Sequence, residues 1–133
     1  MIDPQQAMAI LASADMIHSA DAVSAAVNRI AHEISERFRD SNPVLLCVMN
    51  GGLPFAGQLM MQLSFPLDFD YVHVGRYGQA TSGGELSWRS EPSLSVSGRT
   101  VLVVDDILDE GLTLIAIRDR LLQLGAQACY TVV

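Results

Sequence analysis

The stretch V-L-V-V-D-D-I-L-D-E-G-L-T, from Val101 to Thr113, decides the fold because it joins an apolar strand, an acidic loop and a helix start. Its first four residues are aliphatic and mostly β-branched, a pattern typical of a parallel strand covered on both faces. Open α/β sheets bind ligands at the carboxyl ends of their strands, where the next helix offers backbone N–H groups to an anion. The stretch therefore predicts an α/β fold with a ligand site directly after Val104.

The acidic loop suits a phosphorylated sugar that binds together with a metal ion. Asp105 and Asp106 can accept hydrogen bonds from a ribose diol or hold the water shell of Mg²⁺. The backbone from Asp109 to Thr113 can wrap a phosphate. The alternative is that Asp109 and Glu110 only cap the following helix and complement its dipole. Two acidic pairs, separated by two aliphatic residues and closed by Gly-x-Thr, favour the ligand site.

These residues resemble the binding loop for 5-phosphoribosyl 1-pyrophosphate (PRPP) of the type I phosphoribosyltransferases, and within them of the hypoxanthine-guanine enzymes of purine salvage. The resemblance covers nearly the whole chain and implies that fold, a mostly parallel sheet flanked by helices. It implies that Asp105 and Asp106 contact the ribose hydroxyls and help to organise Mg²⁺ indirectly, through water. Asp109 would be the catalytic base facing the purine N7 and would also contact PRPP. The 5'-phosphate would be held by Glu110, Gly111, Leu112 and Thr113.

A second loop supports this resemblance. Asn50, Gly51 and Gly52 follow an apolar run at residues 44–49 and precede a helical segment with Pro54 in its first turn. The loop resembles the family's pyrophosphate loop, and two glycines let the backbone approach an anion closely. The family often has Lys in place of Asn50, so the resemblance implies that the backbone N–H groups of these three residues bind pyrophosphate. A plain strand-to-helix turn is the alternative.

A third segment, about residues 75–93, is predicted to be a long mobile loop rich in glycine and serine. Long loops inside compact domains are usually functional lids or disordered segments. In the resembling family this region closes over the active site, and the position of Arg76 and Tyr77 contributes to it. An arginine there could pair with pyrophosphate oxygens bidentately. The alternative is a solvent-exposed hairpin.

Composition agrees with a single domain over residues 1–133. The net charge of −7 argues against nucleic acid as a partner, because backbone phosphates demand clustered basic residues. An anionic substrate must then arrive with a metal, as magnesium-complexed PRPP does. The chain has no Lys, which excludes a Walker P-loop and a response-regulator receiver.

Hydrophobic spacing predicts N-terminal helices within residues 1–40 and an α/β core over residues 43–133. Strands are expected to begin near Val44, Phe69, Val101 and Ala128, with helices after the first and third. Cys47 and Cys129 fall within apolar strands and define no metal site, which suggests a reducing, cytoplasmic location. No apolar run approaches the roughly 20 residues that a membrane span requires.

The sequence stops at Val133, inside what is expected to be a central strand, so we expect a chain truncated at its carboxyl end. In the resembling family the chain continues into a purine-binding hood, with a Lys that contacts the base, an aromatic residue that stacks on it and an Asp that binds Mg²⁺. That hood is absent from this sequence. Such a chain could bind PRPP without turning it over.

The resemblance implies transfer of 5-phosphoribose from PRPP to hypoxanthine or guanine, giving IMP or GMP and pyrophosphate. Members of the family commonly form homodimers or homotetramers through helices and loops near the Gly51 segment. Two alternatives stay open: a noncatalytic protein of the same fold that senses PRPP or a nucleotide, and a phosphoribosyltransferase for another base. Base choice depends on residues that lie beyond Val133.

Overall fold

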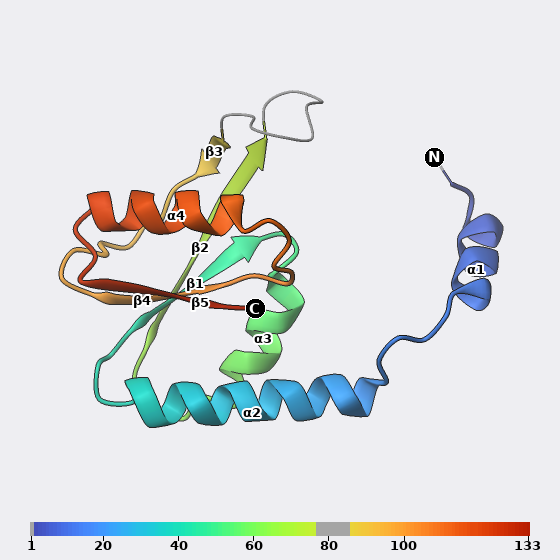
Figure 1. Ribbon diagram of the computed structural model, residues 1–133, viewed down its shortest axis with the longest axis horizontal. Coiled ribbons are helices and arrows are strands. Elements are labelled where there is room, and N and C mark those ends of the chain that lie inside the picture. Colours follow the sequence, from blue (N-terminus) through green and yellow to red (C-terminus); the bar gives the residue numbers. More distant parts are fainter. Residues whose placement is uncertain (1, 77–85) are drawn as a thin grey trace.

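The computed structural model describes residues 2–76 and 86–133 and shows one sheet between two layers of helix (Figure 1). Its strands are β1 (Val44–Met49), β2 (Asp68–Arg76), β3 (Leu86–Ser90), β4 (Thr100–Val104) and β5 (Ala128–Val132). Its helices are α1 (Pro4–Ser13), α2 (Ala20–Phe38), α3 (Leu53–Met60) and α4 (Leu112–Gln123). The order of elements from β1 onward alternates strand and helix, except at β2, β3 and β4, which follow one another without a helix among the described residues.

The sheet has the strand order β3-β2-β1-β4-β5, and every pairing is parallel except that of β2 with β3. The central strands β1 and β4 pair from Val44 with Val101 to Cys47 with Val104. These four residues are fully buried. The aliphatic runs had predicted this burial, because such runs are typical of strands in a sheet that is covered on both faces. The mostly parallel α/β architecture expected from the sequence is therefore confirmed.

Alternate residues of the strands build two separate cores. On one face of the sheet, Val101 and Val103 pack with Ile117 and Leu121 of α4. On the other face, Leu102 and Val104 pack with residues of α2 and α3. Period-two alternation sends neighbouring side chains to opposite faces, so each central strand is apolar throughout. The tight covering of both faces leaves the strand ends as the place for a polar site.

Each of the two N-terminal helices begins after a capping residue. Asp3 caps α1 by accepting hydrogen bonds from the N–H groups of Gln5 and Gln6, and Ser19 caps α2. Four residues of α2 are buried against the sheet: Val27, Ala31, Ile34 and Phe38. Helix α1 buries none of its residues and stands apart from the sheet in Figure 1. Of these two helices, only α2 contributes to the core.

The prediction of a loop across residues 75–93 is wrong for residues 75–76 and 86–90, which are strand. Strand β2 continues to Arg76, and Leu86–Ser90 forms β3, antiparallel to β2. Trp88 packs against the α4-side core, so the alternation of Leu86 and Trp88 with polar residues is that of a half-buried edge strand. The hairpin alternative is the better description there, while Tyr77 and the rest of residues 77–85 lie outside the described residues.

The two cysteines lie where the sequence placed them, Cys47 in β1 and Cys129 in β5, and both are free thiols. Within the part of the chain that the structure describes, no helix has the length and apolar character needed to cross a membrane.

Candidate ligand site at the carboxyl ends of β1 and β4

The two loops singled out in the sequence meet at one edge of the sheet. Because β1 and β4 are parallel neighbours, the loops that leave their carboxyl ends, at Asn50 and Asp105, start side by side. Strand β2, the next strand in the sequence, pairs with β1 on one side, and β4 pairs with β1 on the other side. This reversal of strand order is the topological switch point at which open α/β sheets bind ligands.

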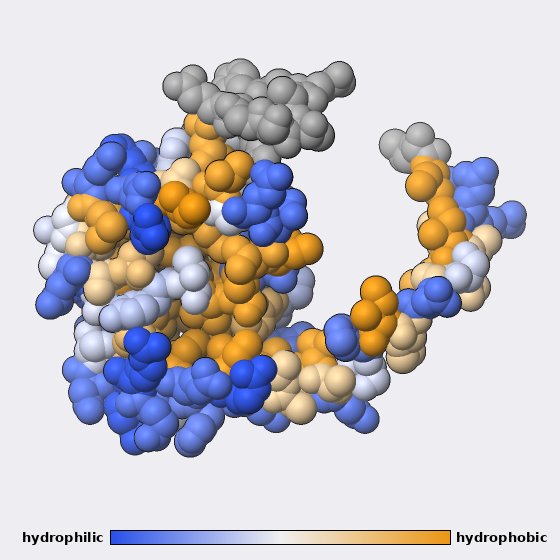
Figure 2. Space-filling view, viewed as in Figure 1, coloured by the Kyte–Doolittle hydropathy of each residue, from blue (hydrophilic) through white to orange (hydrophobic). Residues whose placement is uncertain are grey.

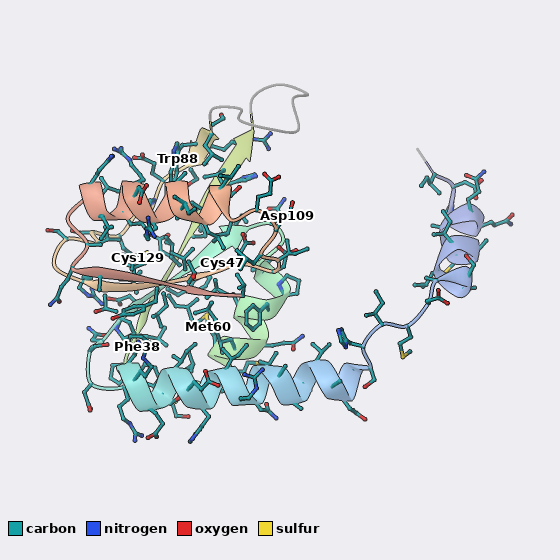
Figure 3. The ribbon with its side chains drawn as sticks, viewed as in Figure 1. Phe38, Cys47, Met60, Trp88, Asp109 and Cys129 are labelled. Carbon is teal, nitrogen blue, oxygen red and sulfur yellow. The ribbon has the colours of Figure 1, made fainter. Side chains whose placement is uncertain are left out.

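A small cavity of about 130 Å³ lies within the loop between β4 and α4. A water molecule occupies roughly 30 Å³ of liquid, so the cavity has room for a group of several heavy atoms. Its lining contains the whole predicted phosphate loop, from Asp109 to Thr113, together with Asp105, Ile107 and Leu114. Figure 3 shows Asp109 beside the first turn of α4, at the edge of the sheet that carries the site. The predicted phosphate residues are thus brought together.

Gly111 shapes the entry into α4. It is the N-cap of that helix and has φ of 77°, in the left-handed region that L side chains rarely adopt. The carbonyl of Gly111 accepts the N–H of Ile115 at 2.9 Å, the first turn of the helix. The N–H groups at the start of a helix have no partner within it and carry the positive end of its dipole. The cavity therefore faces an electropositive helix end.

Asp106 turns away from this cavity toward the β1 loop. A Cβ added to Gly51 would stand 2.6 Å from Oδ2 of Asp106, so only a glycine leaves room for that carboxylate. Asp106 and Gly51 both line a second, larger groove of about 810 Å³ between α2 and α3. Asp105 thus lines the small cavity and Asp106 lines the larger groove. The contact of Asp106 with Gly51 joins the two predicted loops.

The environment of Asp105 disfavours its charged form. Its Oδ1 accepts the backbone N–H of Asp106 at 2.9 Å. Burial raises the pKa of Asp105 to about 6, with the neighbouring Asp106 carboxylate adding to the rise and the backbone hydrogen bond opposing it. A cation or a positively charged reacting centre beside Asp105 would stabilise its carboxylate, so the site is suited to positive charge.

The other predicted residues of the β1 loop are positioned differently. Gly52 is buried, its N–H donates to the carbonyl of Val48 at 3.0 Å, and a Cβ there would stand 2.8 Å from the Val104 carbonyl. Gly52 therefore allows close packing of the loop on β4. Asn50 is exposed and lines none of the cavities described here. Pyrophosphate binding by Asn50, Gly51 and Gly52 stays a prediction, as does the role of Arg76 at the end of β2.

Sequence reasoning missed the larger groove. It is mostly apolar and opens beside Asp106, and its lining includes Phe55 and Gln58 of α3 and Val23 and Val27 of α2. Val23 lies one helical turn before the buried Val27 but is 46% exposed. Helical spacing alone could not separate a residue of the core from one that borders an open groove.

A strand end at a topological switch point, a cavity at a helix N-terminus and an adjacent acidic pair make this a site suited to a phosphorylated ligand, in the class of open α/β proteins. The family model for the phosphoribosyl transferase domain matches residues 13–133, so the chain belongs to that family.

Two relatives are each 33% identical to this chain. One is the hypoxanthine-guanine-xanthine phosphoribosyltransferase of Tritrichomonas foetus, over 80% of this chain and 58% of its own length. The other is the hypoxanthine-guanine phosphoribosyltransferase of Bacillus subtilis, over 72% of this chain and 54% of its own. The chain therefore spans little more than half the length of these relatives.

Solved structures agree with the fold. The hypoxanthine-guanine phosphoribosyltransferase of Bacillus anthracis superposes with a TM-score of 0.83 and 25% identity, covering 89% of this chain and 70% of that one. The enzyme of Leishmania donovani named as hypoxanthine-guanine phosphoribosyl transferase gives 0.81 and 27%, covering 91% and 71%. The type I phosphoribosyltransferase fold expected from the sequence is confirmed.

Proposed function

We propose that this chain binds PRPP and belongs to a purine salvage enzyme that transfers 5-phosphoribose to hypoxanthine or guanine, giving IMP or GMP and pyrophosphate. The observation that carries the proposal is the cavity between Asp105 and Leu114, which joins a helix N-terminus to Asp105 at the end of β4. The names of the relatives support the choice of purine.

The phosphate end of PRPP is assigned to the loop before α4. Gly111 takes a left-handed turn at the N-cap of α4, and the first N–H groups of a helix beside this cavity are suited to an anion. Glu110 and Leu112 are exposed, so their backbone rather than their side chains is the part suited to an anion. The ribose hydroxyls are assigned to Asp105 and Asp106, which can accept hydrogen bonds from a diol.

The donor set also fits Mg²⁺. Proteins usually hold this ion through one or two carboxylates, with the remaining ligands from water and substrate phosphates. Asp105 and Asp106 supply two adjacent carboxylates, and the described residues contain no cluster of three or more metal-ligating side chains that would suggest a dedicated protein cage. Bound Mg²⁺ would neutralise negative charge on the pyrophosphate group. Asp105 and Asp106 would hold it, directly or through water.

The reaction breaks the bond between the anomeric carbon of PRPP and pyrophosphate and forms a bond from that carbon to a purine nitrogen. Positive charge develops on the ribose as the leaving group departs, and the carboxylates of Asp105 and Asp106 stabilise it. Asp109 lines the same cavity and is exposed, so it can accept the purine proton as general base. The purine proton passes to Asp109, and the electron pair of the broken bond stays with pyrophosphate.

Thermal stabilisation by PRPP tests the binding half of the proposal, because specific binding to the folded state raises the melting temperature. We expect a shift with PRPP and Mg²⁺ that is larger than with PRPP alone and is lost in Asp105→Asn/Asp106→Asn. Asp40→Asn is the matched control, because this exposed acid precedes β1 at the opposite edge of the sheet. No shift in a folded sample, or an equal shift in the double variant, would count against the site.

A noncatalytic sensor of PRPP is the second candidate, because the chain spans little more than half of its catalytic relatives. Steady-state formation of IMP or GMP separates the two. Turnover that falls far more than PRPP affinity in Asp109→Asn supports the enzyme and the general base. PRPP binding with no turnover by a version extended to the full length of the relatives supports the sensor. A homodimer or homotetramer, as the resemblance implies, is testable by mass in solution.

A further inference from the structure

The dipeptide Asn50-Gly51 lies in the exposed turn between β1 and α3. In Figure 1 this turn lies on the side of the core that faces α1, and Figure 2 shows open space between that side and α1. An asparagine that precedes glycine can lose its side-chain amide without an enzyme, because glycine has no Cβ to hinder attack by its own backbone nitrogen. The turn is therefore a candidate site of covalent modification within the loop assigned to pyrophosphate.

The chain has three asparagines, and only Asn50 has the neighbour that this reaction needs. Asn42 is followed by Pro43, whose backbone nitrogen carries no proton to lose. Asn28 lies within α2, where the helix fixes the backbone angles and holds the N–H of the next residue in a hydrogen bond. Asn28 and Asn42 are therefore internal controls within the same molecule.

The two groups that react at this position are accessible. Both Asn50 and Gly51 are exposed. Within the described part of the chain, the Asn50 side chain and the Gly51 N–H make no hydrogen bond, whereas the next two N–H groups are occupied. Gly52 donates to the Val48 carbonyl at 3.0 Å, and Leu53 donates to the Asn50 carbonyl at 3.2 Å. No protein contact therefore has to break before the Gly51 nitrogen meets the side-chain carbon of Asn50.

The position of the turn at the start of α3 favours the reaction. Gly52 is the N-cap of α3, so the peptide group between Asn50 and Gly51 lies beside the positive end of the helix dipole. The Leu53 N–H donates to the carbonyl of that same peptide group. Both interactions stabilise the negative charge that this group carries once the Gly51 nitrogen has lost its proton. The Asp106 carboxylate opposes them, but it is exposed and its charge is screened by water.

We propose that Asn50 is a deamidation site and that its conversion ends the binding of PRPP by this loop. The Gly51 nitrogen gives its proton to hydroxide and forms a bond to Cγ of Asn50. The bond from Cγ to Nδ2 breaks, Nδ2 takes a proton from water and leaves as ammonia, and a succinimide ring remains. Water then opens the ring at either carbonyl. The product is aspartate or isoaspartate at this position, and the net reaction consumes one water and releases one ammonia.

Conversion disturbs the contact between Gly51 and Asp106. Gly51 has so little room there that a Cβ would stand 2.6 Å from Oδ2 of Asp106. A carboxylate on the preceding residue brings a second negative charge close to the first, and isoaspartate also lengthens the backbone by one methylene group beside Gly51. A ligand that carries pyrophosphate then meets added charge of its own sign. The loss of binding rests on the function proposed above, whereas the conversion itself does not.

Mass spectrometry of peptides cut from aged, folded protein measures the conversion, with fresh protein as the blank for conversion during digestion. We expect Asn50 to convert at a rate within about a hundredfold of that in a synthetic peptide of residues 48–55, and Asn28 and Asn42 to stay unchanged. Asn50→Gln is the matched variant, because glutamine must close a larger ring, and it should show no conversion at this position. A slower rate at Asn50, or equal conversion at Asn28, would overturn the proposal.

Anion exchange separates converted from unconverted protein of the same aged sample, because conversion adds one negative charge. We expect the unconverted fraction to keep the thermal shift with PRPP and Mg²⁺, and the converted fraction to bind PRPP at least about tenfold more weakly. Asn50→Asp should show the same weakening. Asn28→Asp is its control, because it adds the same charge to an exposed position of α2 that lines none of the cavities.

Equal affinity of the converted and unconverted fractions for PRPP, or of Asn50→Asp and Asn28→Asp, would overturn the loss of binding. Absence of a PRPP shift in fresh, folded protein would instead count against the function proposed above, and the loss of binding would fall with it. The mass measurement uses no ligand, so it decides the conversion of Asn50 in either case.

Discussion

Gly51 and Asp106 are in contact across the two loops of the candidate site, where a Cβ on Gly51 would stand 2.6 Å from one carboxylate oxygen and 2.7 Å from the other. Real Cβ atoms do not approach so closely, so Gly51→Ala must displace the Asp106 side chain or the loop. We predict that this variant folds but loses most of the Mg²⁺-dependent stabilisation by PRPP. Calorimetric titration of PRPP with Mg²⁺ measures that loss.

Gly57→Ala is the matched control for that prediction. Gly57 lies within α3, and a Cβ there meets nothing within 4 Å. Alanine in a helix is favoured over glycine by about 0.5–1 kcal/mol, so this change should raise the free energy of unfolding and leave PRPP binding intact. If Gly51→Ala bound PRPP as well as Gly57→Ala, the Asp106 carboxylate would have no part in the site.

A second prediction concerns the phosphate loop. Gly111 and Gly98 have φ of 77° and 70°, and a Cβ on either would meet no atom closer than 3.5 Å. Alanine at either position is strained by its backbone alone, at a cost of about 1–2 kcal/mol. We expect Gly111→Ala and Gly98→Ala to lose similar stability in urea, and only Gly111→Ala to weaken the binding of PRPP or of inorganic phosphate.

Gly98 serves as the reference in that comparison because it lies in the turn before β4, at the edge of the sheet opposite to the site. A loss of phosphate affinity shared by both variants would trace the effect to general destabilisation. Unchanged affinity in both would remove the conformation of Gly111 from the account of phosphate binding.

The sequence was sufficient for the parts of this molecule that depend on local pattern. The apolar runs at Val44 and Val101 are buried on both faces, and only a central parallel strand satisfies that burial. Asp105, Asp109 and Gly111 share one cavity because they lie within one short loop, so sequence proximity was enough to bring them together.

Other features depend on contacts between distant segments and could not be read from pattern. The approach of Gly51 to Asp106 requires β1 and β4 to be neighbours, although about fifty residues separate the two loops. Strand β3 was missed because a short edge strand gains its stability from its partner, and its own sequence is rich in polar residues.

A third prediction concerns Asp70, the one buried charged residue among the described side chains. Its carboxylate accepts hydrogen bonds from the N–H of Tyr71 at 2.8 Å and from the loop after β3, through the N–H groups of Ser93 and Leu94 at 2.7 and 2.8 Å and the Ser93 hydroxyl. Burial raises the pKa of Asp70, but these hydrogen bonds outweigh burial and hold the pKa below its ordinary value of 3.8. The charged form is therefore the one that stabilises the fold.

A carboxyl group whose pKa is lowered on folding contributes stability above its unfolded pKa and loses it as the pH falls through the folded pKa. Stability from Asp70 should accordingly be complete above about pH 4 and fall below it. We expect Asp70→Asn to cost about 1–3 kcal/mol at neutral pH and to flatten the decline below pH 4, as measured by urea unfolding. Asp68→Asn, which breaks only the exposed pair with Arg99, should cost less than about 1 kcal/mol. Equal costs would contradict the anchoring role of Asp70.

A fourth prediction follows from Asp105, whose shift has the opposite sign. Burial, with the Asp106 carboxylate beside it, raises the pKa of Asp105 to about 6 from an ordinary value of 3.8. The folded state therefore binds this proton more tightly than the unfolded state, and stability falls as the pH rises from about 4 to 6. Asp105→Asn carries no charge, so we expect a higher melting temperature at pH 7 and no decline across that window. Asp40→Asn should keep the decline.

Ligand binding should depend on the same proton in the opposite direction. Mg²⁺ and the ribose hydroxyls require the ionised carboxylate of Asp105, so stabilisation by PRPP with Mg²⁺ should weaken as the pH falls through about 6. At neutral pH the ionised Asp105 carboxylate thus lowers the stability of the ligand-free protein and favours ligand binding. This combination is typical of functional carboxylates. A melting temperature of Asp105→Asn equal to that of the parent at pH 7, together with PRPP affinity constant from pH 7.5 to 5, would show that Asp105 is an ordinary exposed acid.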